Sequence, residues 1–324
     1  MVYKIINISP RPLVSSFEEI KHTWGRSGFG GIMANKGFKT IEEQLSILKG
    51  RGLIVPDEEV AKDFLRRNNY YRISGYSLTL RSHDVFNSGA TFQNIMDIYR
   101  FDHELRHVLL HYLEIIEVTV KSVYAHEFTK RHGATDYLNP AFFSDTTKHK
   151  EIIEKAEKQK NLRLPHEAYL KHFVDELQQD IPLWAYVDLL TIADISFLFK
   201  ISQPDVKDAT ALVLGLNVSG ASLLERFMHS MTIIRNLCAH GSRLYNRLFE
   251  QKPSLKKREQ SILRKNEDGT MDNAHLFGYI LIMRRLLKQD EFAEMKNRIL
   301  KITQKYPFVS MRYYGFPDNW KSVL

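Results

Sequence analysis

Helical periodicity dominates the pattern of apolar and polar positions along the chain. The longest regular stretch begins after Thr91, where apolar side chains such as Ile95 and Leu105 recur at intervals of three and four residues to about Arg131. The same periodicity predicts further helices over residues 147–160, 166–179, 183–201, 220–240 and 274–303. Because no other pattern covers so much of the chain, the sequence predicts a predominantly all-α fold.

The residues before this long helix carry a different mixture of signals. Thr40 and Glu43 have the spacing of a capping box, and Asp57 starts a second helical pattern after Pro56. The stretch "YYRISGYSLTLRSH" has nearly alternating aromatic residues, so we expect an extended or hairpin segment there. The expected parts of the chain are an N-terminal extension over 1–38, a small helical and extended segment over 39–90, and a helical domain over 91–324.

Composition narrows the class of protein. The chain has 324 residues, of which 44% are hydrophobic, and this is enough to form a substantial core. Its single cysteine, Cys238, excludes a disulfide framework and favours a reducing compartment. The most apolar stretch is interrupted by Asp188 and Asp194, so we expect a soluble cytoplasmic protein without a membrane segment. The net charge of +8 favours a polyanionic partner such as nucleic acid or an anionic membrane surface.

The helix expected over 220–240 ends in an unusual group of polar residues. Asn236 and His240 are one turn apart on its polar side, whereas Arg235 lies about 140° from His240, at the edge of the apolar side. The charge of Arg235 therefore needs an anionic partner. Gly241 has the position of a left-handed residue that ends a helix. The apolar side is expected to consist of Leu224, Phe227, Met228, Met231, Ile234 and Cys238.

Two interpretations of this helix end follow from the residues alone. Arg and His are common near helix C-termini, because they satisfy free carbonyl groups and complement the helix dipole. Alternatively, Arg235 and His240 are groups that handle phosphate. Asn236 could then orient the imidazole, and Arg243 and Arg247 would add guanidinium groups suited to phosphate.

Several longer stretches, taken in order, favour the second interpretation. They are "TIEEQLSILKGRGLIV", "FLRRNNYYRISGY", "IYRFDHELRHVLLHYLEIIE", "PLWAYVDLLTIADISFLF", "RNLCAHGSRLYNR" and "YGFPDNW", and they cover most of residues 39–320. Together they resemble the Abi-like family of bacterial phage-defence proteins, of the AbiD and AbiF type, in the HEPN superfamily of α-helical RNases. HEPN RNases use an arginine and a histidine in R-x4-6-H, often with a polar residue after the arginine.

The resemblance implies a specific activity. The region 91–324 would be a HEPN-like helical bundle, with Arg235, Asn236 and His240 as catalytic residues in a site formed by two copies of the chain. The expected protein is a homodimeric, metal-independent endoribonuclease without a cofactor, in an abortive-infection or toxin–antitoxin system. RNA would be its substrate, and a structured RNA could regulate it. The alternative from another class is a non-catalytic RNA-binding protein of a defence system.

The long helix contains a possible zinc motif. His103, Glu104 and His107 form H-E-x-x-H, in which two histidines on one face bind zinc and the glutamate activates water. A zinc metallopeptidase is therefore a further alternative. No decisive third ligand follows, although Glu127 comes twenty residues after His107, and Arg106 would place a cation beside the metal. We therefore expect no metal site here.

The same helix contains a second R-x-x-x-x-H, from Arg106 to His111, which is an alternative catalytic pair. Arg106 and Glu117 are eleven residues apart and share a helical face, where they could organise a neighbouring helix. Glu117 or Glu114 could be the anion that Arg235 requires when no RNA is bound.

A basic and aromatic segment precedes the long helix. Guanidinium groups follow phosphates and tyrosine rings stack on unpaired bases, so this segment is a candidate surface for single-stranded RNA. The tyrosines could equally be core residues that flank a turn. The residues are Arg66, Arg67, Tyr70, Tyr71, Arg72 and Tyr76.

Overall fold

The computed structural model describes residues 37–217 and 220–324. Helices account for most of these residues, and the two short strands β1 (Arg81–Ser82) and β2 (Val85–Phe86) form an antiparallel hairpin. The predicted all-α class is therefore confirmed. The expected extension over 1–38 lies outside the described residues, except for its last two positions. No helix in the described ranges is long and apolar enough to cross a membrane.

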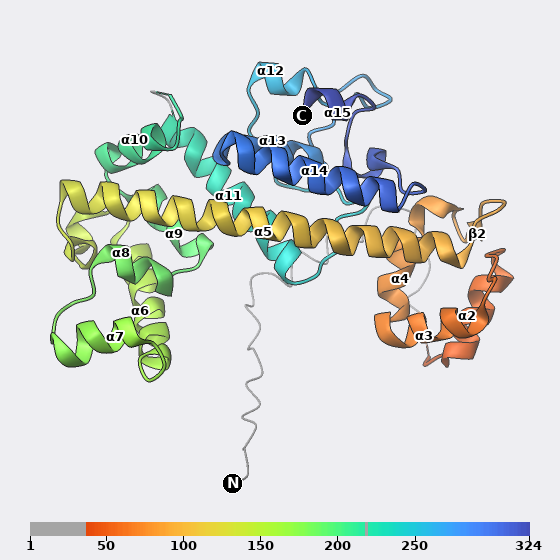
Figure 1. The fold of residues 1–324 in the computed structure, drawn as a ribbon, viewed down its shortest axis with the longest axis horizontal. Coiled ribbons are helices and arrows are strands. Elements are labelled where there is room, and N and C mark those ends of the chain that lie inside the picture. The colour runs from red at the N-terminus through yellow and green to blue at the C-terminus, as the bar shows by residue number, and fades with distance from the viewer. Residues whose placement is uncertain (1–36, 218–219) are drawn as a thin grey trace, which may run out of the picture.

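Helix α5 (Phe92–Arg131) is the central element of the molecule (Figure 1). It has 40 residues and begins as predicted, because the Thr91 side chain accepts a hydrogen bond from the backbone N–H of Asn94 at 3.1 Å. The Asn94 side chain in turn accepts one from the backbone of Thr91 at 2.9 Å. At 1.5 Å per residue the helix is about 60 Å long, and it contacts helices from both the N-terminal and the C-terminal parts of the chain.

Other helices pack on α5 along its whole length. Helices α13 (Leu276–Leu286) and α14 (Gln289–Lys305) lie along one side of it, and α10 (Pro204–Val213) packs on its C-terminal half (Figure 1). Helix α11 (Gly220–Ala239) crosses α5 and also packs on α9 (Ile192–Ile201). This crossing brings the C-terminal end of α11 close to the middle of α5.

The remaining elements complete the two ends of the molecule and its surface. The remaining α-helices and the π-helical turn are the 18-residue α6 (Thr146–Arg163) and the short elements α7 (Ala168–Lys171), the π turn (His172–Glu176), α8 (Leu183–Tyr186), α12 (Lys257–Gln260) and α15 (Trp320–Val323). The 3₁₀ turns are Leu78–Leu80, Asp136–Leu138, Pro140–Phe142, Val187–Leu189 and Met311–Tyr314.

The N-terminal segment is more helical than the sequence predicted. It contains α2 (Ile41–Gly50), with the expected capping box at Thr40, and α3 (Glu58–Asn68). The expected extended segment is wrong for its first half, because residues 70–76 form helix α4 (Tyr70–Tyr76). Asn69 caps α4 by accepting a hydrogen bond from the backbone of Tyr71 at 2.9 Å. Burial of one face of α4 against α5 outweighs the strand propensity of its aromatic residues.

Three of the predicted long helices are shorter or divided. The pattern over 183–201 is interrupted where Thr191 and Asp194 form a new capping box at the start of α9. The pattern over 166–179 gives only α7 and the π turn, and 274–303 is divided into α13 and α14. Periodicity runs across these breaks because both sides of each break bury apolar residues in the same core.

Candidate functional site

Helix α11 ends in a Schellman motif, as Gly241 predicted. Gly241 has φ +64°, its N–H donates to the Cys238 carbonyl at 3.1 Å, and the N–H of Ser242 donates to the Leu237 carbonyl at 2.8 Å. Asn236 and His240 are both exposed. The predicted apolar side is confirmed, since these residues are buried: Leu224, Phe227, Met228, Met231, Ile234 and Cys238.

Arg235 forms the ion pair that its position required. Its Nε lies 3.3 Å from Oε2 of Glu117 on α5, and its side chain remains 37% exposed. Lys121 contacts the other carboxylate oxygen of Glu117 at 3.0 Å. Of the two anions considered from the sequence, Glu117 is the partner, whereas Glu114 is exposed. The Arg235 side chain forms no hydrogen bond within the described ranges, and its partial exposure leaves its guanidinium accessible to a ligand.

Helix α4 contacts the end of α11 through Arg72. The guanidinium of Arg72 donates a hydrogen bond to the Gly241 carbonyl and lies 5.6 Å from the centre of the Tyr99 ring. It therefore satisfies a carbonyl at the C-terminus of α11 and complements the helix dipole. The sequence suggested RNA contact for Arg72, and its position adds a structural role beside His240.

Asp102 holds together the segments around this helix end. It is fully buried, and it accepts hydrogen bonds from Tyr76 at 2.7 Å, Tyr314 at 3.0 Å and the Tyr245 backbone at 2.9 Å. It also pairs with Arg106, which is 2% exposed. These partners compensate for the cost of burying a carboxylate. The loop that follows α11 is thereby fixed to α5 and α4.

This network corrects the expected role of Tyr76. Its ring is completely buried, and burial together with the negative charge of Asp102 raises the pKa of its hydroxyl. Tyr76 cannot stack on an RNA base, because its hydroxyl and ring are needed to bury Asp102. Sequence periodicity did not reveal this, since an aromatic residue at a turn fits either role.

The alternative catalytic pair, Arg106 and His111, points to two different sets of neighbours. Arg106 is directed at Asp102, whereas His111 is exposed and its ring lies 4.9 Å from the Tyr112 ring. Within the described part of the chain, no hydrogen bond joins Arg106 to His111. Arg106 and Glu117 do lie on α5 where α11 crosses it, but each has a different partner.

The two arginines after the cap are partly buried. Arg243 donates to the Tyr245 carbonyl and, at 3.3 Å, to the Asn246 carbonyl. Arg247 lies 5.8 Å from the centre of the Phe249 ring. Burial lowers the pKa of both guanidinium groups below the usual value. Arg243 is therefore occupied by the chain's own backbone, and a role in RNA binding would require it to exchange these partners.

The other members of the basic and aromatic segment lie at the surface. Tyr71 is 61% exposed and Tyr70 is half-buried, with their rings perpendicular at 6.1 Å. Arg67 pairs with Asp63 at 2.9 Å, and Arg66 is also exposed. This surface is available to a strand of RNA, and its use in RNA binding stays a prediction.

The two histidines of the H-E-x-x-H motif lie side by side on α5, but the described residues do not supply a complete set of zinc ligands. The rings of His103 and His107 are 4.4 Å apart. Glu104 instead accepts hydrogen bonds from Lys305 at 2.6 Å and Tyr306 at 2.7 Å. Burial alone would raise the pKa of Glu104, but these two donors lower it. Among the described residues, no group of three metal-ligating side chains comes together, here or at Glu127, which pairs with Arg131.

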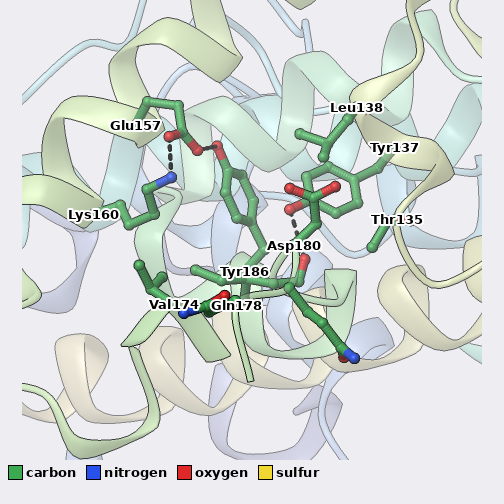
Figure 2. A pocket seen from close by; sticks show the side chains of 11 residues that line it. Thr135, Tyr137, Leu138, Glu157, Lys160, Val174, Gln178, Asp180 and Tyr186 are labelled. Carbon is green, nitrogen blue, oxygen red and sulfur yellow. Dashed lines mark hydrogen bonds and ion pairs between the residues drawn. The ribbon is translucent and has the colours of Figure 1, made fainter. Parts of the chain in front are cut away.

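A separate cavity of about 760 Å³ lies between α6, the π turn and α8 (Figure 2). Tyr186 donates to Glu157 at 3.2 Å, and Tyr137 donates to the Ile181 carbonyl at 2.8 Å. Glu157 also pairs with Lys160. These polar groups satisfy one another, and none of the residues at the end of α11 lines the cavity.

Comparison with known proteins places the chain in one family. A family model described as Abi-like protein matches residues 63–246, which is more than half of the chain. The chain therefore belongs to the family of Abi-like proteins. The matched region runs from α3 to the loop after α11 and so includes both Asp102 and His240. No curated protein and no solved structure matches the chain.

Proposed function

We propose that this protein is a metal-independent endoribonuclease of a bacterial abortive-infection system, with Arg235, Asn236 and His240 as its catalytic residues. The observation that carries the proposal is the end of α11, where exposed Asn236 and His240 accompany Arg235, whose side chain is 37% exposed and forms an ion pair with Glu117. The resemblance to HEPN RNases and the membership of the Abi-like family support it.

The residues suit cleavage by the RNA's own 2′-hydroxyl. Neutral His240 would take the proton from this hydroxyl, and its oxygen would attack the adjacent phosphorus. The bond from phosphorus to the 5′-oxygen would then break, and this oxygen would take up a proton from a second group, such as the imidazolium of another copy of His240. The products are a 2′,3′-cyclic phosphate and a 5′-hydroxyl. Arg235 would stabilise the charge of the phosphorane, and Asn236 would orient the imidazole or the phosphate.

The mechanism also favours a homodimer. It needs one group that accepts a proton and another that donates one, whereas one chain offers a single histidine in this motif. A two-fold pair of chains would bring two Arg235–His240 sets into one cleft, as the HEPN resemblance implies.

The test is cleavage of mixed single-stranded RNA in excess EDTA. We expect wild-type protein to cleave and His240→Ala to lose at least about 100-fold in rate, the range typical of a lost proton-transfer group. The products of the wild-type reaction should end in 2′,3′-cyclic phosphate. Activity that disappears with EDTA and returns with zinc would contradict the proposal, as would equal rates for a folded His240→Ala variant.

A non-catalytic RNA-binding protein is the second candidate. The net charge of +8 and the exposed residues Arg66, Arg67 and Tyr71 favour it as much as they favour an enzyme. Tight binding of RNA by wild-type protein without any cleaved product, in EDTA or with added metal, would support this candidate instead.

A further inference from the structure

The paired histidines of α5 have no role in the mechanism above. His103 and His107 are exposed, with their rings 4.4 Å apart. The carboxylate between them in sequence is unavailable, because Glu104 is bound by Lys305 and Tyr306. The two imidazoles therefore face solvent without a described acidic partner. A neutral imidazole offers one N–H donor and a protonated imidazole offers two, so the pair can hold an anion.

The surroundings of the pair are positively charged. Burial lowers the pKa of His103, and the positive charges of His107 and Arg106 lower it further. Glu104 opposes this effect, while Arg72 on α4 adds to it. Positive charges that disfavour protonation of His103 also attract an anion to the same place. Arg106 is neutralised by Asp102, so Arg72 and the two histidines remain as the groups for an incoming anion.

Arg72 connects this pair to the catalytic helix end. Its guanidinium donates to the Gly241 carbonyl, directly after His240, and rests on the Tyr99 ring. Tyr99 lies one turn before His103 on α5, so Arg72 lies beside the face that carries the histidine pair. Arg72 therefore lies between the face of α5 that carries the histidine pair and the end of α11.

We propose that His103 and His107, together with Arg72, form a subsite for a backbone phosphate of the RNA strand whose scissile phosphate lies at His240. The identity of the anion rests on the proposed function. Charge-assisted hydrogen bonds from imidazolium and guanidinium groups hold phosphate and fix the register of the strand without reading its bases. This assigns the H-E-x-x-H stretch to RNA binding.

The experiment measures binding without cleavage. The probe is a single-stranded RNA that is 2′-O-methylated throughout, which lacks the nucleophile, and its affinity for the whole protein is followed by fluorescence anisotropy at several salt concentrations at pH 6. We expect His103→Gln with His107→Gln to weaken binding several-fold and to reduce the salt slope by about one. His103→Lys with His107→Lys should restore the slope, because it keeps the charge.

The matched control is His126→Gln, since His126 is an exposed histidine on α5, far from the pair in sequence. It should bind the probe as wild type does. If wild-type protein cleaves RNA but the double Gln variant binds like the control, the subsite is wrong and the proposed function stands. If the double Gln variant binds weakly while natural RNA is never cleaved, the subsite stands and the catalytic proposal fails. If the wild type does not bind the probe, the subsite is also wrong.

Discussion

Asp102 determines the arrangement of the site more than any residue that faces solvent. Its carboxylate is fully buried and receives donors from α4, α5, the loop after α11 and the C-terminal 3₁₀ turn. An acidic residue on the apolar face of the long helix was visible in the sequence. Its partners were not, because periodicity gives the direction of a side chain and says nothing of which distant segment supplies its donors.

Loss of the Asp102 charge should therefore destabilise the protein strongly. Asp102→Asn leaves Arg106 buried without an anion, and we expect the free energy of unfolding to fall by about 3–5 kcal/mol. Urea denaturation measures this. The control is Asp63→Asn, which removes only an exposed pair with Arg67 and should cost less than about 1 kcal/mol. Equal stability of the two variants would show that the network around Asp102 contributes little.

At Arg235, the effect of the positive charge can be tested separately from the effect of the planar guanidinium. The position of Arg235 at the edge of the apolar side predicted an anionic partner, with Glu117 or Glu114 as the candidates, and Glu117 fills this role. Since Lys121 also contacts Glu117, removing Arg235 does not leave this carboxylate alone. The cost to stability should then be small, as for other partly exposed pairs.

Arg235→Lys should lower the rate of RNA cleavage by roughly 100-fold or more, because lysine keeps the charge but lacks the planar fork that stabilises a phosphorane. Thermal denaturation should give a Tm close to that of the wild type. Lys121→Ala, which removes the other cation on Glu117, is the control and should keep its activity. Normal cleavage by Arg235→Lys would mean that only the positive charge matters.

Helix ends were the elements best predicted from sequence. The caps at Thr40, Thr91 and Gly241 were correct, because each depends on residues close in the chain. Helix α4 was not predicted, since its helical state depends on packing against α5. The division of 183–201 was missed for a related reason, namely that one apolar face runs across the break at Thr191.

The Schellman end of α11 should be essential for activity beyond its effect on stability. Gly241→Ala forces a side chain into the left-handed region at φ +64°, and the new Cβ would lie 3.4 Å from Arg72. We expect a loss of about 1 kcal/mol in stability and a clear loss of cleavage, because His240 and Arg72 shift together. Gly89→Ala has φ +79° and open space around it, so it should show a similar loss of stability with normal cleavage. Equal cleavage by both variants would show that the Schellman end of α11 is not needed for RNA cleavage.

The N-terminal helices should contribute affinity more than rate. Arg66→Ala with Arg67→Ala removes two exposed cations next to Tyr71, and we expect weaker RNA binding with a salt slope reduced by about one to two. The salt dependence of binding measures this. Lys150→Ala with Lys158→Ala on α6 removes the same charge elsewhere on the surface and is the control. An identical slope for both double variants would exclude this segment from the binding surface.

At the scale of the molecule, α5 packs against segments inside the region matched by the family model and against segments that follow it. The matched region ends at residue 246, yet α13 and α14 pack on α5, and Tyr314 donates to Asp102. The C-terminal region therefore belongs to the same core as the site. The boundary expected at residue 91 stays a prediction, and α4 and Arg72 contact α5 and the end of α11 across it.

The proposed homodimer gives the last prediction, at a surface beside the site. Val118 follows Glu117 on α5 and is 60% exposed, although it is apolar and lies one residue from the anchor of Arg235. A second copy that shares the cleft would cover it, and Val118→Lys would then place a charge at the interface. We expect this variant to be monomeric by sedimentation, to keep its Tm and to cleave RNA slowly. Leu212→Lys on α10, which is 69% exposed, should remain dimeric and active. A monomeric wild type with full activity would show that one chain suffices, and a second proton-transfer group would then have to come from the same chain.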